Sequence, residues 1–185
     1  PPGGSDATGT LGHVAAAFEI DEQIGDGPAP DAIYVAAGTL GTVAGLALGL
    51  ALAGRSIPVN GVRITSRLVT NRRMLRRLLA GAAALLEEAG VATGDAAARA
   101  DASVRILDDQ VGVGYGHETE AGRAATEQFA QLGITLDATY TAKAAAAVRA
   151  ASDSRPLFWH TLSATMPPAG AMPALPTAFA EYLSS

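Results

Sequence analysis

The sequence predicts an α/β domain built on an open, mostly parallel sheet with helices on both faces. Short apolar segments rich in β-branched residues alternate with longer segments of helical periodicity along the chain. Turns containing glycine or proline separate these segments, as expected for strand–helix–strand units with right-handed crossovers. The 185 residues, 49% of them hydrophobic, suffice for one domain with its own core, and no internal repeat is evident.

The first predicted element is an amphipathic helix at residues 13–23. Val14, Ala17 and Phe18 share one face of this segment, while acidic residues occupy the other. Residues 32–35 follow as a short buried strand of β-branched and aromatic residues, bounded by prolines before and a glycine after.

The segment between Asp31 and Arg55 allows two interpretations, because it is free of charge and long enough to cross a bilayer. Its two flanking charges are single, however, and no basic cluster or aromatic belt accompanies them. Continuous apolar runs are also usual for parallel strands covered on both faces. We therefore predict a buried strand, a glycine turn and, after Gly41, a helix that packs closely on its neighbours through Gly45 and Gly49.

The remaining elements continue the alternation. Four arginines near the start of the next helix, with spacings of four, predict a solvated face more than a phosphate grip, because the rest of the chain is acidic. Strands are predicted at 59–65, 104–107 and 156–160, and helices at 71–89, at 118–132, from 141 onward and, after a proline-rich loop at 166–176, at 177–183.

Composition excludes several classes of function. The net charge of −5 and the pI near 5.1 offer no general attraction to nucleic acid or to an acidic membrane surface. There is no cysteine, so disulfides and thiolate chemistry are impossible, and a cytoplasmic location is the default expectation. The three histidines show no metal-ligand spacing, and neither a P-loop nor a GxSxG or HExxH motif occurs, so no metal site is predicted.

Four candidate sites follow predicted strands or begin a helix, where ligands of parallel sheets bind. In Gly38-Thr39-Leu40-Gly41-Thr42, glycines, helix-start amides and hydroxyls suit a phosphate, although a tight turn without a ligand explains the glycines equally well. Tyr115 lies in a glycine-rich turn, where packing is the more common role. Thr141 follows Tyr140 at a helix entry and can be a cap or a ligand donor. Thr161 follows the last strand.

In this order and spacing, these segments resemble the C-terminal half of the fold type II pyridoxal-phosphate enzymes related to D-cysteine desulfhydrase and 1-aminocyclopropane-1-carboxylate deaminase. The resemblance covers nearly the whole chain and favours phosphate binding over a membrane span. The matching segments are Pro2-Gly3-Gly4-Ser5 with Gly9-Thr10-Leu11-Gly12-His13, residues 37–46, Leu107-Asp108-Asp109 with Gly114-Tyr115-Gly116 and Glu120-Ala121-Gly122, residues 136–144, and Leu157-Phe158-Trp159-His160-Thr161.

The resemblance implies the larger, cofactor-phosphate-side domain of such an enzyme, with pyridoxal 5'-phosphate as cofactor. Tyr115 and Tyr140 would lie near the substrate and help with proton transfer or orientation. Thr141 matches the position that bonds the pyridine nitrogen, where the deaminases carry glutamate, so the chain is more similar to the desulfhydrases. The residues implied in cofactor binding are Gly38, Thr39, Leu40, Gly41, Thr42, Thr141 and Thr161.

The chain departs from the family pattern at glycine positions and at the lysine. Leu40, Ala142 and Leu162 stand where the family has glycine, and each adds bulk where the backbone approaches a ligand. In the family the Schiff-base lysine lies in the N-terminal part; the only lysine here, Lys143, matches a non-catalytic position, for which a structural or surface role is expected.

Residues 1–185 are therefore interpreted as the C-terminal portion of such an enzyme, completed by a second polypeptide that supplies the lysine. The expected reaction is α,β-elimination, β-replacement or deamination of a small amino acid, with this chain inactive alone. An apolar surface left bare by the absent part predicts an oligomer. Two alternatives stay open: a non-catalytic interaction subunit that has lost the cofactor, and a small binder of phosphorylated ligands.

Overall fold

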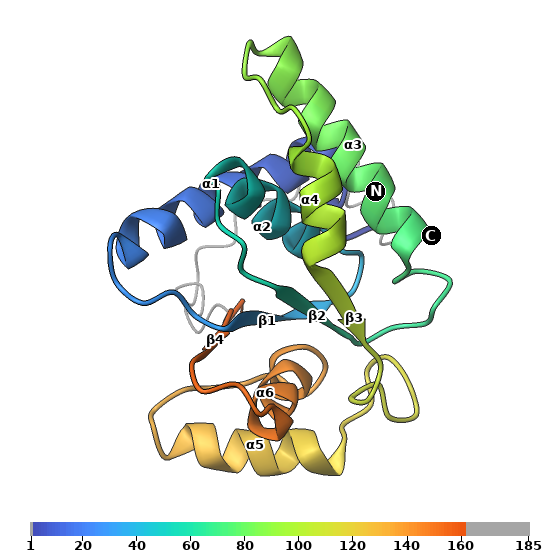
Figure 1. Ribbon diagram of the computed structural model, residues 1–185. Coiled ribbons are helices and arrows are strands. Elements are labelled where there is room, and N and C mark those ends of the chain that lie inside the picture. The colour runs from blue at the N-terminus through green and yellow to red at the C-terminus, as the bar shows by residue number, and fades with distance from the viewer. Residues whose placement is uncertain (1, 162–185) are drawn as a thin grey trace, which may run out of the picture.

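The computed structural model describes residues 2–161 and has a four-stranded parallel sheet at its centre, in the order β3-β2-β1-β4 (Figure 1). Neighbouring strands are in a regular parallel register, with Ile33 of β1 opposite Val59 of β2 and Leu157 of β4. The predicted α/β class with a parallel sheet is confirmed. The strands are β1 (Ala32–Ala37), β2 (Val59–Arg63), β3 (Val104–Leu107) and β4 (Pro156–Phe158).

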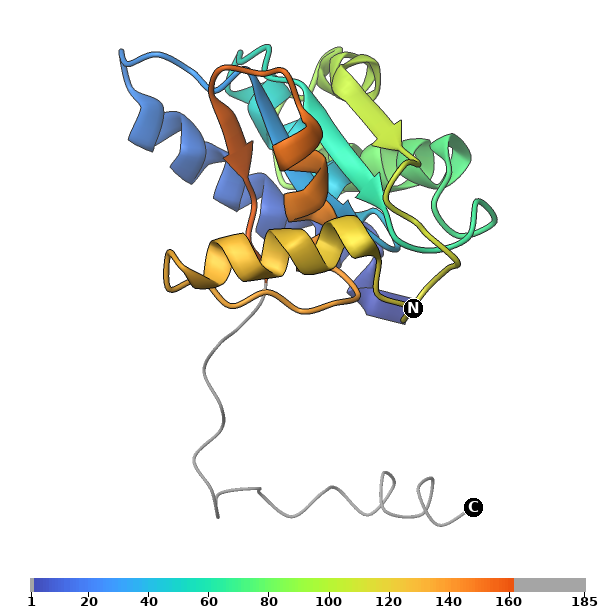
Figure 2. The ribbon, with the colours of Figure 1, turned by 90° about the horizontal axis from the view of Figure 1, so that it is seen from below.

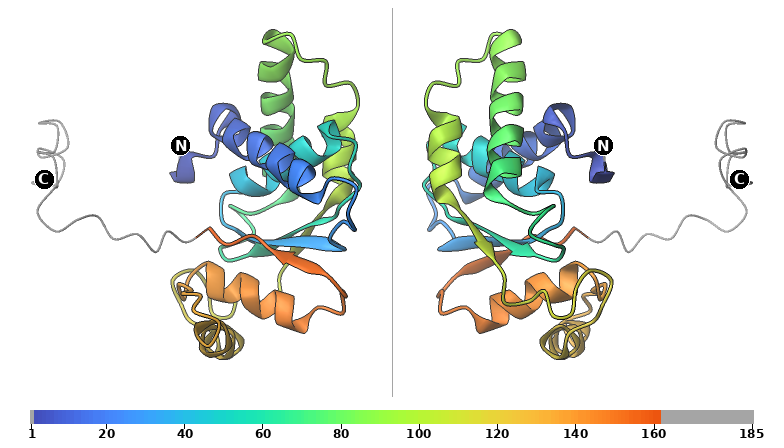
Figure 3. Two further views of the ribbon diagram at one scale, coloured as in Figure 1. Left: turned by 90° about the vertical axis from the view of Figure 1, so that its left-hand side faces the viewer. Right: turned by 90° about the vertical axis from the view of Figure 1, so that its right-hand side faces the viewer.

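Helices cover both faces of the sheet. Figures 1 and 3 show α1 to α4 on one face and α5 and α6 on the other. The view from below places α5 and α6 across the strands (Figure 2). The helices are α1 (Ala7–Ile24), α2 (Gly41–Leu52), α3 (Arg72–Glu88), α4 (Ala96–Ser103), α5 (Glu120–Ala130) and α6 (Thr141–Ala150), preceded by a 3₁₀ turn at Pro2–Gly4.

The apolar segment that suited a membrane span forms β1, a glycine turn and α2, as predicted. Ten of the twelve residues of α2 are buried, because the helix lies between the sheet and α1. At Gly49 an added Cβ would lie 2.5 Å from the carbonyl oxygen of Val14, and at Gly45 one would lie 2.5 Å from that of Thr10. The two glycines therefore allow α1 and α2 to touch backbone to backbone. Within residues 2–161, every helix is too short or too polar to span a membrane.

Several predicted boundaries were wrong. Helix α1 begins at Ala7 rather than at residue 13, because the Asp6 side chain caps it by accepting a hydrogen bond of 2.7 Å from the amide of Gly9. Strands β2 and β4 end two residues earlier than predicted, and α5 is shorter at both ends. The predicted loop at 166–176 and helix at 177–183 lie outside the described residues.

Sequence reasoning missed helix α4 entirely. Its eight residues are mostly alanine with two charges, so its apolar periodicity is weak, and only Ala96 and Ala100 are buried. Tertiary contacts stabilise it: Asp101 accepts hydrogen bonds from Arg72 and Arg76 of α3. Two of the four arginines of α3 are thus paired within the fold, and none lines the cavity described below.

Candidate functional site

The strand order creates a crevice at the carboxyl end of β1. The chain proceeds from β1 to β2 and β3 on one side, and then returns to place β4 on the other side of β1. Such a reversal separates the loops after the two neighbouring strands and is where ligands of open α/β sheets bind. A cavity of about 630 Å³ lies there; its lining comprises Gly3, Gly4, Ser5, Gly9, His13, Ala36, Gly38, Thr39, Leu40, Gly41, Thr42, Thr65, Ser66, Tyr115, Tyr140 and Thr161.

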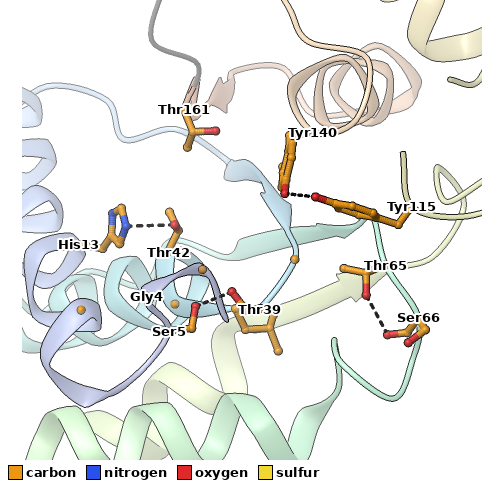
Figure 4. A pocket seen from close by; sticks show the side chains of 16 residues that line it. Gly4, Ser5, His13, Thr39, Thr42, Thr65, Ser66, Tyr115, Tyr140 and Thr161 are labelled. Carbon is orange, nitrogen blue, oxygen red and sulfur yellow. Dashed lines mark hydrogen bonds between the residues drawn. The ribbon is translucent and has the colours of Figure 1, made fainter. Parts of the chain in front are cut away.

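One wall of the cavity, which we call the anion wall, consists of residues 3–5 and 38–42 together with His13. The hydroxyls of Ser5 and Thr39 are 2.5 Å apart, which joins the N-terminal turn to the loop after β1 (Figure 4). A Cβ on Gly3, whose φ is 64°, would lie 2.6 Å from Thr39 Oγ1. The first amides of α2 have no partners inside the helix and carry its positive dipole end. The wall therefore offers amides and hydroxyls, which are donors for an anion.

His13 links α1 to the start of α2. Its Nε2 lies 3.1 Å from Thr42 Oγ1, and both residues line the cavity (Figure 4). Burial lowers the pKa of His13 from its ordinary value, because a charged imidazole is poorly solvated there. At neutral pH the ring is uncharged and either donates to or accepts from the threonine hydroxyl.

Leu40 adopts a left-handed conformation, with φ of 70°, immediately before α2. It is the one non-glycine residue with positive φ among the described residues. The sequence predicted that its bulk would stand where the backbone approaches the ligand. Its side chain is instead 2% exposed and belongs to the hydrophobic core, so the bulk of Leu40 points mainly into the protein.

The opposite side of the cavity, the tyrosine wall, consists of Tyr115 and Tyr140. Their hydroxyl oxygens are 2.6 Å apart and their rings meet edge to face, with centroids separated by 5.9 Å (Figure 4). The hydrogen bond with Tyr115, followed by burial, raises the pKa of Tyr140 to about 12. Tyr140 also approaches the loop after β1, since a Cβ on Gly38 would lie 3.8 Å from its ring. The two tyrosines thus present a connected pair of hydroxyls across from the anion wall.

Thr141 does not line this cavity and is almost fully buried. Its Oγ1 bonds to Asp137, accepting from the amide at 2.8 Å and lying 2.7 Å from the carboxylate. Burial alone would raise the pKa of Asp137, but hydrogen bonds from Thr141, Tyr140 and Thr139 outweigh it and lower that pKa. Of the two roles that the sequence left open, these contacts are those of a helix-start motif.

The cavity brings together the other predicted residues, namely residues 38–42, Tyr115, Tyr140 and Thr161. It also adds residues that sequence reasoning did not assign to a site. Ser5 and His13 carried a signal, because both lie in a segment that matches the family pattern. Thr65 and Ser66 carried none; they reach the cavity only because β2 lies beside β1 in the sheet.

Lys143, the only lysine, lies outside the cavity lining on α6. Its side chain is 0% exposed, and its Nζ donates to the carbonyl oxygens of Val111 at 2.8 Å and Gly114 at 3.0 Å. Burial lowers the pKa of this ammonium. The sequence left two roles open for Lys143, structural or on the surface. This buried placement agrees with the structural role and is inconsistent with a position on the surface.

The open α/β sheet with a crevice at the carboxyl end of β1, and the glycine loop at a helix start, define the class of α/β proteins that bind phosphorylated ligands and cofactors. Residues 1–157 match the family model of pyridoxal-phosphate dependent enzymes. The chain therefore belongs to this family.

Curated relatives narrow the resemblance. The chain is 37% identical over 147 residues to D-cysteine desulfhydrase of Klebsiella pneumoniae subsp. pneumoniae, covering 79% of this chain and 42% of that protein. It is 34% identical over 173 residues to D-cysteine desulfhydrase of Salmonella paratyphi B, covering 87% and 48%. A crystal structure described as the ACC deaminase homologue superposes with a TM-score of 0.68 at 31% identity, over 85% of this chain and 46% of that one. The chain thus spans less than half the length of these proteins.

The residues present fit a phosphorylated cofactor on the anion wall. Ser5, Thr39 and Thr42 contribute hydroxyls at the amino end of α2. Gly3 and Gly41 let the N-terminal turn approach this loop closely, since an added Cβ would lie 2.6 Å from Thr39 Oγ1 at Gly3 and 2.8 Å from Ser5 Oγ at Gly41. Among residues 2–161, no cluster of three or more histidine, aspartate or glutamate side chains has metal-binding geometry. The hydroxyls and backbone amides of the anion wall are hydrogen-bond donors, which suit an anion.

Proposed function

We propose that this chain is the cofactor-phosphate side of a pyridoxal-phosphate dependent enzyme that acts on a small amino acid. The observation that best supports this proposal is the cavity at the carboxyl end of β1, where the loop at residues 38–42 faces Tyr115 and Tyr140. The family match supports the cofactor, and the similarity to D-cysteine desulfhydrases supports a lyase or deaminase. The reaction we propose is α,β-elimination, with β-replacement or deamination as related outcomes.

The chain's own residues would divide the work between the two walls. The amides and hydroxyls of residues 38–42, with Ser5, would bind and orient the phosphate. When bound, pyridoxal phosphate supplies an electron sink for negative charge at the substrate's α-carbon. The hydroxyl of Tyr140, whose pKa is about 12, stays protonated at neutral pH and can donate a proton or a hydrogen bond. Tyr115 shares that proton through their 2.6 Å contact.

The lysine that binds the cofactor's aldehyde must come from outside these 185 residues, and we propose that a second polypeptide carries it. Lys143 is the only lysine, and its amine is engaged with two backbone carbonyls away from the cavity. The matched part of this chain covers 42% and 46% of two relatives, so the remainder of those proteins has room for such a lysine. The chain alone would then bind cofactor without turning over a substrate.

Exposed apolar residues support a partner at this end of the sheet. Leu68, in the loop after β2, is 90% exposed, and Val113, in the loop after β3, is 85% exposed. Asp108 connects the two loops through ion pairs with Arg63 and Arg67. A second polypeptide that completes the site would cover these two apolar side chains.

The first experiment is intact-mass spectrometry of the natively purified protein, incubated with pyridoxal phosphate and reduced with borohydride. We expect a pyridoxyl adduct on a second, lysine-bearing polypeptide and an unmodified 185-residue chain. An adduct on Lys143 would contradict the assignment of that lysine. If no polypeptide gains an adduct, the alternative of an interaction subunit that has lost the cofactor replaces the enzyme proposal.

A second measurement tests the anion wall of this chain directly. Pyridoxal phosphate should raise the thermal unfolding midpoint, whereas pyridoxal, which lacks the phosphate, should not. Thr39→Val should reduce the stabilisation, because it removes a hydroxyl from the wall. Thr126→Val is the matched control, since the Thr126 hydroxyl bonds within α5, away from the cavity. Equal stabilisation by both compounds would argue against a phosphate site.

A further inference from the structure

Lys143 is the largest fully buried side chain of the described residues. Lysine is rarely buried completely, and when it is, a carboxylate usually pairs with it. Among residues 2–161, the ion pairs within 4.0 Å do not include Lys143. The ammonium is satisfied instead by the carbonyl oxygens of Val111 and Gly114. Desolvation of this charge is therefore offset by contacts with one loop.

That loop carries Tyr115. The carbonyl oxygen of Gly114, which lies 3.0 Å from the amine, belongs to the residue immediately before Tyr115. Gly112, Gly114 and Gly116 all have positive φ, and Val113 is 85% exposed, so the loop has little apolar packing of its own. Its own backbone hydrogen bonds, from Val111 to Asp108 and from Gly114 to Val111, are long at 3.3 Å each. A contact from outside the loop therefore helps to keep it in one conformation, because glycines raise its conformational entropy.

The other end of the anchor lies on the same turn of α6 as the second tyrosine. Tyr140 precedes the first residue of α6, and Lys143 follows three residues later. A single helical turn therefore carries both Tyr140 and the amine that binds the loop of its partner, Tyr115. The 2.6 Å contact between the two hydroxyls closes this ring of interactions.

We propose that Lys143 is a positioning residue that fixes the Tyr115 hydroxyl against the Tyr140 hydroxyl at the cavity wall. This inference deepens the proposed function and rests on it only for the chemical use of the two tyrosines. The assignment of Lys143 to the tyrosine pair stands on the contacts of this chain alone.

The test compares Lys143→Met with the parent chain. Methionine keeps most of the volume but removes the charge and the donors, so it releases the loop without leaving a buried charge unpaired. The global unfolding midpoint should change little, since replacing a buried charge by an apolar group of similar size is often neutral. An effect of this substitution on the tyrosine pair can then be distinguished from a general loss of stability.

The readout is the ionisation of Tyr140. The sequence has four tyrosines, so Tyr34→Phe and Tyr182→Phe leave only the pair. Tyrosinate absorbance is recorded within milliseconds of a rapid pH jump, before the protein unfolds. In the parent, Tyr140 should ionise with a pKa of about 12; Asp137 and Tyr115 are the groups that act on it. In Lys143→Met this pKa should fall toward about 10, up to a hundredfold change in the ionisation constant.

Rescue and a matched control complete the design. Because the chain has no cysteine, Lys143→Cys alkylated with bromoethylamine while unfolded and then refolded rebuilds an amine of nearly lysine length at this position alone. It should restore the high pKa of Tyr140. Ala146→Gly weakens the same helix at a buried position without touching the loop, and should lower the unfolding midpoint while leaving that pKa at about 12.

Two results would overturn the proposal: an unchanged pKa of Tyr140 in Lys143→Met, or an equal fall of that pKa in Ala146→Gly. Stabilisation by pyridoxal phosphate, measured on the same variants, is independent of the tyrosine readout. Its absence from every variant would contradict the proposed function and leave the role of Lys143 intact.

Discussion

The two walls of the cavity are built in different ways. The anion wall is continuous with the core, since residues 38–42 lead into α2, which packs against α1 through Gly45 and Gly49. The tyrosine wall is partly solvent-facing: Tyr115 is 56% exposed and Tyr140 is 39% exposed. The loop that carries Tyr115 is held by polar contacts with the buried Lys143.

This difference suits the roles we propose for the walls. A site for a charged, constant part of a ligand benefits from rigid elements, because donors fixed in advance need no reorganisation on binding. Residues that meet a substrate must stay accessible until the substrate arrives, and loops supply that accessibility. The exposed tyrosine wall is also the side that a completing polypeptide would cover.

The largest effect expected is from Gly49→Ala, which attacks the packing behind the anion wall. Its Cβ would lie 2.5 Å from the Val14 carbonyl oxygen, so α1 and α2 must separate, at a cost of about 3 kcal/mol of unfolding free energy. Denaturant unfolding measures the loss. Gly12→Ala on the exposed face of α1 meets nothing within 4 Å and should stabilise by up to about 1 kcal/mol. Equal stability of both variants would contradict the backbone contact.

Leu40→Gly should destabilise the chain by about 1–2 kcal/mol, less than Gly49→Ala. Glycine relieves the left-handed strain, about 1 kcal/mol, but loses a buried leucine side chain worth about 3 kcal/mol. Sulfate serves as a simple anion in place of the cofactor's phosphate. Its affinity, measured by calorimetry, should stay unchanged in this variant, because the Leu40 side chain packs into the core. Tighter sulfate binding by this variant would instead support the expectation from sequence that Leu40 obstructs the ligand.

Ser5→Ala tests the division between the walls and should weaken sulfate binding about fivefold. The serine hydroxyl is paired with Thr39 on the anion wall, and the loss of one hydrogen bond is worth about 1 kcal/mol. Tyr115→Phe removes a hydroxyl of the other wall and should leave sulfate affinity unchanged. An equal loss of sulfate affinity in both variants would contradict the assignment of anion binding to the anion wall alone.

The smallest expected effect is a pH dependence at His13. Burial lowers its pKa, so protonation favours the unfolded state, and without an anion stability declines as the pH falls below about 6.5. Bound sulfate favours the protonated ring, so sulfate affinity should rise about threefold between pH 7.5 and pH 5. Sulfate itself keeps its charge over this range. His13→Gln should abolish the rise; its persistence in that variant would exclude His13 as the titrating group.

The sequence by itself determined the class of fold and most of one wall. Sequence patterns located the four strands seen in residues 2–161, and helices α1, α2, α3, α5 and α6, although α1 begins six residues earlier than predicted. The glycine loop at residues 38–42 was recognisable from its strand–loop–helix context, and the family resemblance that it carried was confirmed. Helix α4 was not predictable from its own residues. The contacts that stabilise it, the hydrogen bonds of Asp101 with Arg72 and Arg76, are made with another helix, α3.

Only the tertiary structure decided which residues share the cavity. Ser5 and His13 join residues 38–42 because α1 crosses α2 at close range, and Thr65 and Ser66 join because β2 lies beside β1. It also directed Lys143 inward to the loop of Tyr115. Local patterns predict elements because they reflect burial within one segment. Contacts between residues far apart in the sequence, such as Lys143 with Gly114 at 29 positions, depend on how the segments pack.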